Sequence, residues 1–140
     1  MSYNLLKGKR GIIFGALNDA SIAWKVAERV VEEGAQIVLT NTAVACRMGT
    51  IDELAKKTSA TIIPADATSV EDLNNLFVKA QEALGGKIDF VLHSCAMSVN
   101  MRKKRTYDDL DYGFLDKTLD ISAISFHKML QVAKKLDALT

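Results

Sequence analysis

The sequence has little of what would place it in several large protein classes. It contains one proline and eight glycines in 140 residues, which excludes collagen-like and low-complexity chains. Its two cysteines, Cys46 and Cys95, form no CxxC pair and fit a reducing cytoplasm better than a disulfide-stapled fold. No apolar run approaches the ~20 residues that span a bilayer, and no secretory signal pattern opens the chain.

A dominant charge of one sign is also missing. Lys and Arg number 18 and Asp and Glu number 17, so no overall field favours binding to nucleic acid or to an anionic membrane. The basic run at 102–105 lies near several aspartates, and we interpret it first as a solvated loop and second as a docking site for an acidic partner. With 49% apolar residues, the composition indicates one globular domain or part of one.

Short apolar runs alternate with amphipathic segments along the chain. Expected strands lie at Ile12–Phe14, Gln36–Thr40, Thr61–Ile63 and Ile88–Leu92, and expected helices at Ser21–Glu33, Thr50–Thr58, Ser69–Leu84 and Asp109–Leu139, with a loop between Cys95 and Asp108. This order predicts an α/β fold, a Rossmann-type doubly wound parallel sheet, truncated after the fourth strand and the following long helix. A fifth strand is expected next, so we expect the fourth strand to have an unpaired edge.

Residue spacing predicts the buried side of each helix. In the first helix, Ile22, Val26 and Val30 recur every four residues, and with Ala23, Ala27 and Val31 beside them they predict one apolar face. The long helix is expected to bury Phe114, Leu115, Leu119, Ser122, Phe126, Leu130 and Ala133. Further apolar residues lie outside that stripe, which indicates packing against a partner subunit or a further part of the protein.

The turn after the first strand is the first candidate site. Such a turn lies beside the positive end of a helix, where Gly15 permits close approach of a phosphate and Ser21 offers a hydroxyl. The GxGxxG pattern is missing, so this turn alone favours a plain structural interpretation, with Ser21 as a helix cap. Asp66 and Ser94 follow the third and fourth strands, and they too have plain interpretations as a helix-entry residue and a strand terminator. Because parallel strands end at one edge, the set predicts a dinucleotide crevice there.

Several segments together resemble one known family. The pattern of Gly8-Lys9-Arg10, Gly15 and Ser21-Ile22-Ala23 resembles the opening of the enoyl-acyl carrier protein reductases, a divergent branch of the short-chain dehydrogenase/reductases. The resemblance continues through Asp66-Ala67, Phe90–Ser94 and Asp120-Ile121-Ser122. It extends over essentially the whole chain.

The resemblance implies a role for each matching position. Gly15, Ser21 and Ile22 would line the cofactor pyrophosphate, Thr42 would lie near the adenosine ribose, Asp66 and Ala67 would hold the adenine, Ser94 and Cys95 would lie under the nicotinamide ribose, and Ser98 would border the acyl substrate. The neutral segment Thr40-Asn41-Thr42 favours NADH over NADPH, with Arg47 as the nearest cation for a 2′-phosphate. Ala96 stands where the family has glycine, and it adds a methyl group where the backbone and the cofactor would approach closely.

The implied activity is NADH-dependent reduction of trans-2-enoyl-acyl carrier protein in fatty acid biosynthesis. The resemblance also implies a homotetramer. The cysteine usage, the balanced charge and the residue spacing predict a cytoplasmic protein with no metal, nucleic acid or membrane partner. The family's catalytic tyrosine and lysine have no counterpart here, because the one spacing match, Tyr3 with Lys7, precedes the first strand. Residues 1–140 are therefore expected to form the dinucleotide-binding half of a single-domain reductase. Two alternatives remain, another short-chain dehydrogenase acting on a carbonyl substrate and a non-catalytic dinucleotide-binding module.

Overall fold

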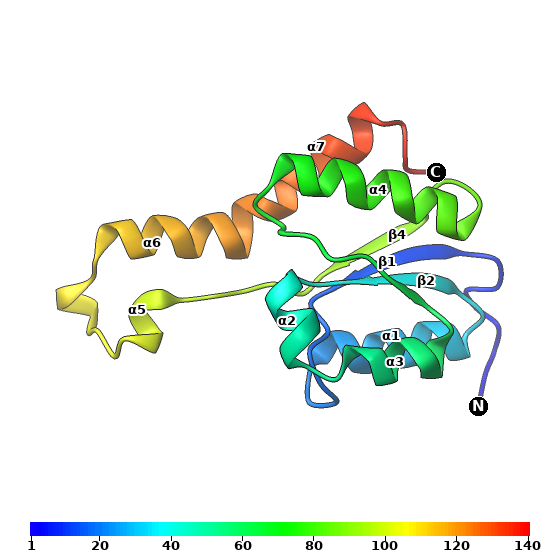
Figure 1. The fold of residues 1–140 in the computed structure, drawn as a ribbon, viewed down its shortest axis with the longest axis horizontal. Helices are drawn as coiled ribbons and strands as arrows, with labels where there is room; N and C mark the ends of the chain where they lie inside the picture. The colour runs from blue at the N-terminus through cyan, green and yellow to red at the C-terminus, as the bar shows by residue number, and fades with distance from the viewer.

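Four parallel strands form one sheet in the order β3-β2-β1-β4 (Figure 1). The computed structural model describes residues 1–140. The strands are β1 (Arg10–Phe14), β2 (Gln36–Thr40), β3 (Thr61–Ile62) and β4 (Phe90–His93). In the central register, Ile13 pairs with Leu39 on one side and with Leu92 on the other. The predicted Rossmann-type sheet is confirmed, with β3 shorter than expected and β4 shifted toward His93.

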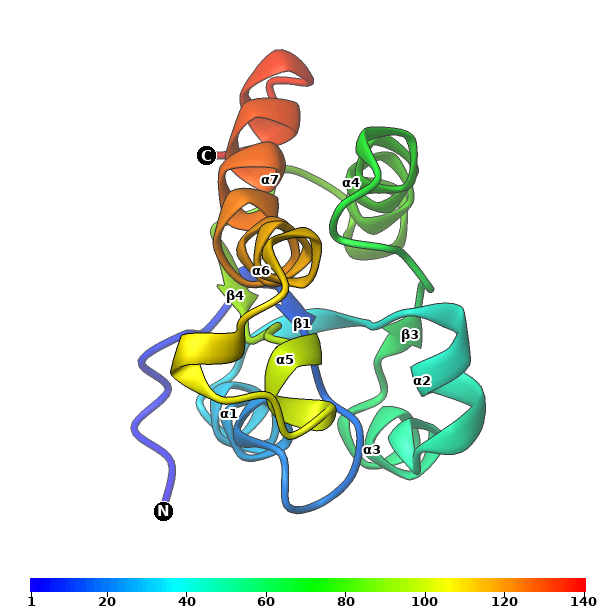
Figure 2. The same cartoon turned by 90° about the vertical axis from the view of Figure 1, so that its left-hand side faces the viewer.

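Helices cover both faces of this sheet (Figure 2). One layer holds α1 (Ile22–Glu32) and α3 (Ile51–Thr58), and the opposite layer holds α4 (Val70–Leu84) and α7 (Ser125–Lys135). Successive strand residues point to opposite faces, so Ile13 and Leu39 pack in the first layer while Ile12 and Val38 pack in the second. This alternation explains why β1, β2 and β4 each contain a run of consecutive apolar residues.

Local signals fix the ends of the longest regular helix, α4. The Ser69 hydroxyl accepts a hydrogen bond from the N–H of Asp72 at 3.2 Å, as expected for a helix cap. At the other end Gly85 adopts a left-handed conformation with φ 76°, which glycine takes without steric cost.

The expected apolar face of α1 is confirmed at Ala23 and Ala27, with partly buried valines packed beside them, but it is wrong at Ile22. Ile22 is 76% exposed, while the residues against the sheet are Ala23, Trp24 and Ala27. Two neighbouring stripes on this helix are apolar, and the sheet packs against the one with small alanines. Small side chains let the helix axis approach the strands closely. The Trp24 indole N–H donates to Glu28 at 2.8 Å, which satisfies its polar edge.

Three short helical segments were not expected from the sequence. They are α2 (Ala43–Met48), α5 (Val99–Arg102) and the 3-10 turn η1 (Tyr107–Asp109), the last two lying inside the expected loop. Segments of three to six residues are too short to show helical periodicity. Side-chain caps set the start of two of them, Thr42 for α2 and Ser98 for α5.

The expected long helix is interrupted by a π-helical turn. It consists of α6 (Tyr112–Leu119), the π segment η2 (Asp120–Ile124) and α7, and it ends at Lys135 rather than at Leu139. A π turn rotates the residues that follow it by about 100° relative to a continuous α-helix. The predicted burial of Leu119, Phe126 and Leu130 is wrong, since they are 48%, 44% and 44% exposed. The rotation accounts for Phe126 and Leu130, whereas Leu119 precedes the turn. The predicted burial of Ala133 is confirmed. The buried positions are Ser125, Met129, Val132 and Ala133.

The outer edge of β4 is paired at its beginning. A parallel bridge joins Ile88 to Leu139, with Ile88 N–H donating to the Ala138 carbonyl at 2.8 Å and Thr140 N–H donating to the Ile88 carbonyl at 3.1 Å. The expected free edge thus starts only beyond this bridge. In the direction of the strand ends, α5 and α6 project past the sheet as an arm (Figure 1). No helix combines the length and apolar character needed to cross a bilayer.

Candidate functional site

The carboxyl ends of the four strands meet at one edge of the sheet, beneath the projecting arm. From central β1 the chain passes to β2 on one side, whereas β4 lies on the other side. The loops after β1 and β4 therefore diverge, and the crevice between them is where open α/β sheets bind ligands. All predicted site residues lie on the loops or helix starts along this edge.

Gly15 and Ser94 form the floor of the crevice. Gly15 has φ 118°, and a Cβ atom there would overlap the carbonyl oxygen of Ser94. The Ser94 N–H donates to the Phe14 carbonyl at 2.9 Å, which holds the two strand ends together. Only glycine fits, for both conformational and steric reasons. Gly15 itself is partly exposed at this edge of the sheet.

Ser21 organises the turn in a way that sequence reasoning did not predict. Its hydroxyl accepts hydrogen bonds from the N–H groups of Leu17 and Asn18, each at 3.1 Å. It makes no cap bond to α1, so the expectation that it caps this helix is wrong. The turn closes on itself, and the first N–H groups of α1, beginning with Ile22, keep no side-chain partner. Unpaired N–H groups at a helix start are suited to an anion.

The end of β2 contributes Asn41 and Thr42. The Thr42 hydroxyl accepts from Ala45 N–H at 3.2 Å and caps α2, while Arg47 is exposed and forms no ion pair. Sequence reasoning gave Asn41 no site role. Its side-chain amide donates to the Ala16 carbonyl at 2.9 Å and its own carbonyl accepts from Ala65 N–H. Asn41 thus ties the loop after β1 to the loop after β3, and its only sequence signal was a polar residue after a buried strand.

Asp66 and Ala67 lie in the loop before α4. The Asp66 carboxylate accepts from the N–H and hydroxyl of Thr68 at 2.8 and 2.7 Å, and it is exposed. The Asp66 N–H donates to the Asp72 carboxylate at 2.9 Å. Ala67 is buried beside this turn. The loop is fixed by its own hydrogen bonds and presents one carboxylate at the crevice edge.

The loop after β4 carries Cys95, Ala96 and Ser98. Burial raises the pKa of the Cys95 thiol to about 12, so the thiol stays protonated and unreactive. Ala96 is exposed and its φ is not positive, so this backbone does not need the family's glycine. The Ser98 hydroxyl accepts from Met101 N–H at 3.3 Å and begins the projecting arm. Ser98 thus lies beyond the end of β4, at the start of α5.

His93, the last residue of β4, borders an open hollow of about 430 Å³ that is also lined by Ser122, Ala123 and Phe126. Its Nε2 lies 2.7 Å from the Ser125 hydroxyl, which donates its hydrogen to the Ile121 carbonyl. Ser125 can then only accept, so His93 Nε2 carries a hydrogen and donates it. Burial lowers the pKa of His93, which keeps the ring neutral. Sequence reasoning did not find this pair, because its two members are far apart along the chain.

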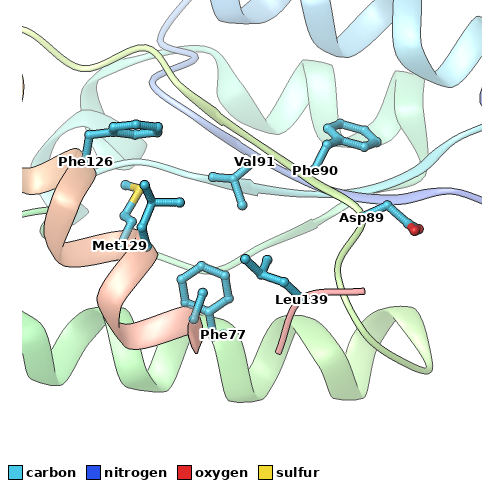
Figure 3. Close-up of a pocket in the computed structure, with 9 residues that line it drawn as sticks. Phe77, Asp89, Phe90, Val91, Phe126, Met129 and Leu139 are labelled. Carbon is cyan, nitrogen blue, oxygen red and sulfur yellow. The ribbon is translucent and has the colours of Figure 1, made fainter. Parts of the chain in front are cut away.

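A second cavity of about 140 Å³ lies between β4 and the α4–α7 layer (Figure 3). Its walls are almost entirely apolar, with Phe77, Val91 and Met129 around it. At its rim the Asp89 carboxylate is already engaged by Arg10 N–H at 2.8 Å and by the Thr140 hydroxyl at 3.1 Å. Because no free polar group would orient a ligand, this cavity belongs to the core rather than to the site.

The arrangement at the crevice can bind but shows no acid–base or nucleophilic constellation. Tyr3 lies at the opposite end of the molecule, where its N–H donates to Glu33 at the end of α1. Tyr107 and Tyr112 are exposed on the arm. No three His, Cys, Asp or Glu side chains gather closely enough to hold a metal ion.

Comparisons with known proteins agree with this geometry. A family model described as Enoyl-(Acyl carrier protein) reductase matches residues 15–139. The enoyl-(acyl-carrier-protein) reductase (NADH) FabI of Rickettsia bellii is 33% identical over 137 residues, which cover 97% of this chain and 52% of that protein. Enoyl-(acyl-carrier-protein) reductase (NADH) 1 of Rhizobium meliloti is 37% identical over 123 residues, covering 87% and 44% respectively.

Solved structures give the same result. The FabI–NADH complex of Alistipes finegoldii is 71% identical with a TM-score of 0.97, covering 99% of this chain and 49% of that one. The Bacillus cereus enoyl-acyl carrier protein reductase, in complex with NADP⁺ and an indole naphthyridinone, is 27% identical with a TM-score of 0.85, covering 97% of this chain and 52% of that one. The chain thus spans about half the length of the relatives it matches.

Proposed function

This chain belongs to the enoyl-(acyl carrier protein) reductase family, and on that basis we propose that it forms the NADH-binding half of an enzyme that reduces trans-2-enoyl thioesters. The family model covers residues 15–139, a span that contains every proposed site residue. The substrate class proposed is an enoyl chain carried on acyl carrier protein, as the names of the relatives state for those proteins. The proposed process is fatty acid biosynthesis.

The observation that carries the proposal is the glycine floor of the crevice. Gly15 has no side chain at a point where a Cβ would meet Ser94, and the unpaired start of α1 lies beside it. A pyrophosphate needs this combination, namely a backbone it can approach and free N–H groups at a helix start. We place the pyrophosphate at Gly15, Ser21 and Ile22, with the exposed Ile22 side chain leaving its own N–H accessible.

The two ends of the dinucleotide follow from this placement. We assign the adenine to Asp66 and Ala67, the adenosine ribose to Thr42, the nicotinamide ribose to Ser94 and Cys95, and the acyl substrate to Ser98. When bound, NADH supplies a hydride to the substrate β-carbon. The chain's own residues orient the two ends and line the crevice. None of them is placed to stabilise charge on the reacting thioester, so that role falls to residues outside 1–140.

The assembly proposed is a homotetramer in the cytoplasm. Support for self-association comes from apolar side chains that are partly exposed along α6, η2 and α7, namely Leu119, Ile124, Phe126 and Leu130. The unpaired cysteines are compatible with a reducing compartment.

Calorimetry with NADH on residues 1–140, followed by an NADH-oxidation assay with crotonyl thioester, tests the proposal. We expect saturable binding of NADH, loss of binding in Gly15→Val, no turnover by these residues alone, and association detected by light scattering. If the chain is part of an enoyl reductase, a longer gene product that contains it should reduce the crotonyl thioester. Absence of NADH binding by the folded chain would reject the proposal. Binding without thioester reduction by the longer product would favour a different short-chain dehydrogenase or a non-catalytic binding module.

A further inference from the structure

The π segment η2 (Asp120–Ile124) lies between α6 and α7, close to the loops that leave the sheet. π turns are rare, because the extra residue weakens the regular hydrogen-bond pattern, and they occur frequently at functional sites. Ser122 of this turn contacts the loop after β4 directly. Asp120 of the same turn binds Lys128 of α7, and Lys128 in turn contacts the loop after β3.

Ser122 holds the loop after β4 by hydrogen bonding to both the N–H and the carbonyl of Met97. Its hydroxyl accepts from Met97 N–H at 3.1 Å and donates to the Met97 carbonyl at 3.3 Å. Met97 lies between Cys95 and Ser98, the two positions assigned to the nicotinamide ribose and the acyl substrate. A pair of hydrogen bonds to one residue fixes its position and its orientation, which a single contact would not.

Asp120 holds the loop after β3 through Lys128. The Lys128 ammonium donates to the Asp120 carboxylate at 2.8 Å and to the Thr68 carbonyl at 3.0 Å. Thr68 is the residue whose N–H and hydroxyl orient Asp66. Lys128 is 27% exposed, so its charge is partly shielded from water, which strengthens these contacts.

We propose that the π segment positions both ends of the bound dinucleotide, with Ser122 setting the nicotinamide-end loop and Lys128, held by Asp120, setting the adenine-end loop. The inference rests on the proposed NADH site. Ser122 and Lys128 are positioning residues, because each acts through a loop rather than on the cofactor. Loss of either contact lets its loop sample other conformations, and the apparent Kd rises as the binding-competent fraction falls.

Calorimetric titration of the 140-residue chain with NADH and, separately, with ADP tests the two halves. ADP carries the adenosine and the diphosphate but no nicotinamide ribose, so it does not report on the nicotinamide end. Ser122→Ala removes both hydrogen bonds to Met97 and is expected to raise the Kd for NADH by about fivefold or more, since one such bond alone corresponds to a factor of about five, and to leave the Kd for ADP unchanged. Lys128→Met is expected to raise both Kd values together. Ser122→Thr keeps the hydroxyl and adds a methyl that the open hollow beside it can hold, so it should restore NADH binding.

Thr118→Ala is the matched control. Its hydroxyl donates to the Phe114 carbonyl at 2.9 Å within the same helix and contacts neither loop. A general loss of helix stability would therefore appear in Thr118→Ala and Ser122→Ala alike, and it would weaken ADP and NADH equally. Three results would overturn the inference without contradicting the NADH site: equal effects of Thr118→Ala and Ser122→Ala, equal weakening of ADP and NADH binding in Ser122→Ala, or an unchanged NADH Kd in Ser122→Ala. Failure of the unsubstituted chain to bind NADH would instead reject the site and the inference together.

Discussion

Replacing Gly15 with alanine should destabilise the fold far more than a comparable change at another glycine. A φ of 118° lies outside the left-handed well that an L-residue tolerates, and the strain is of order 1–3 kcal/mol. The added Cβ also overlaps the Ser94 carbonyl, a backbone atom that can move only with the end of β4. Overpacking of this kind costs about 1–3 kcal/mol more. The free energy of unfolding should therefore fall by about 2–6 kcal/mol in Gly15→Ala.

Gly85→Ala separates strain from overlap. Gly85 also has positive φ, at 76°, but no atom lies within 4 Å of the position its Cβ would take. Only the left-handed conformation is penalised there, so a loss of about 1–2 kcal/mol is expected. The difference between the two variants measures how closely the backbone at Gly15 approaches the loop after β4.

Urea unfolding followed by circular dichroism, with one shared m-value, gives both free energies. In a thermal melt the Gly15→Ala midpoint should drop by roughly 10 °C or more. Equal losses in Gly15→Ala and Gly85→Ala would refute the close approach, and with it the argument that only glycine fits the crevice floor.

Three further results are expected. NADPH should bind with a higher Kd than NADH, because the neutral segment Thr40-Asn41-Thr42 offers no positive charge to a 2′-phosphate. Arg47→Ala should leave the NADH Kd unchanged, because NADH has no 2′-phosphate for this cation to bind. A lower Kd for NADPH than for NADH in calorimetry would contradict the expectation. With a pKa of about 12, Cys95 should react with iodoacetamide at pH 8 roughly a hundredfold more slowly than a free thiol, with a rate still rising at higher pH; mass spectrometry of the labelled peptide measures it. The Arg10 N–H lowers the pKa of Asp89 below its ordinary 3.8, so its carboxylate contributes stability above that pH and loses it as the pH falls through the folded pKa. Asp89→Asn should therefore flatten the fall in unfolding free energy between about pH 5 and pH 3 in urea titrations, and an unchanged slope would contradict this.

Local patterns in the sequence were sufficient for the architecture. Apolar runs of strand length alternating with helical stripes predicted the parallel sheet, because each run must be buried on both faces. The cap at Ser69 and the left-handed Gly85 were predictable for the same reason, since each depends on residues within one turn of itself. Gly15, Asp66 and Ser94 were predicted to lie at one edge of the sheet because parallel strands end there, and the structure brings Gly15 and Ser94 into contact.

Long-range geometry decided the rest. Whether Ile22 or Ala23 faces the sheet depends on how closely α1 packs, and spacing allowed both. The π turn has no sequence signature, yet it rotates the final helix so that Met129 is buried and Phe126 is partly exposed. The contact between Ser122 and Met97 joins residues 25 apart, and Asn41 links three strand ends. Such contacts form only once the sheet has assembled, because their energy comes from groups that no local pattern brings together.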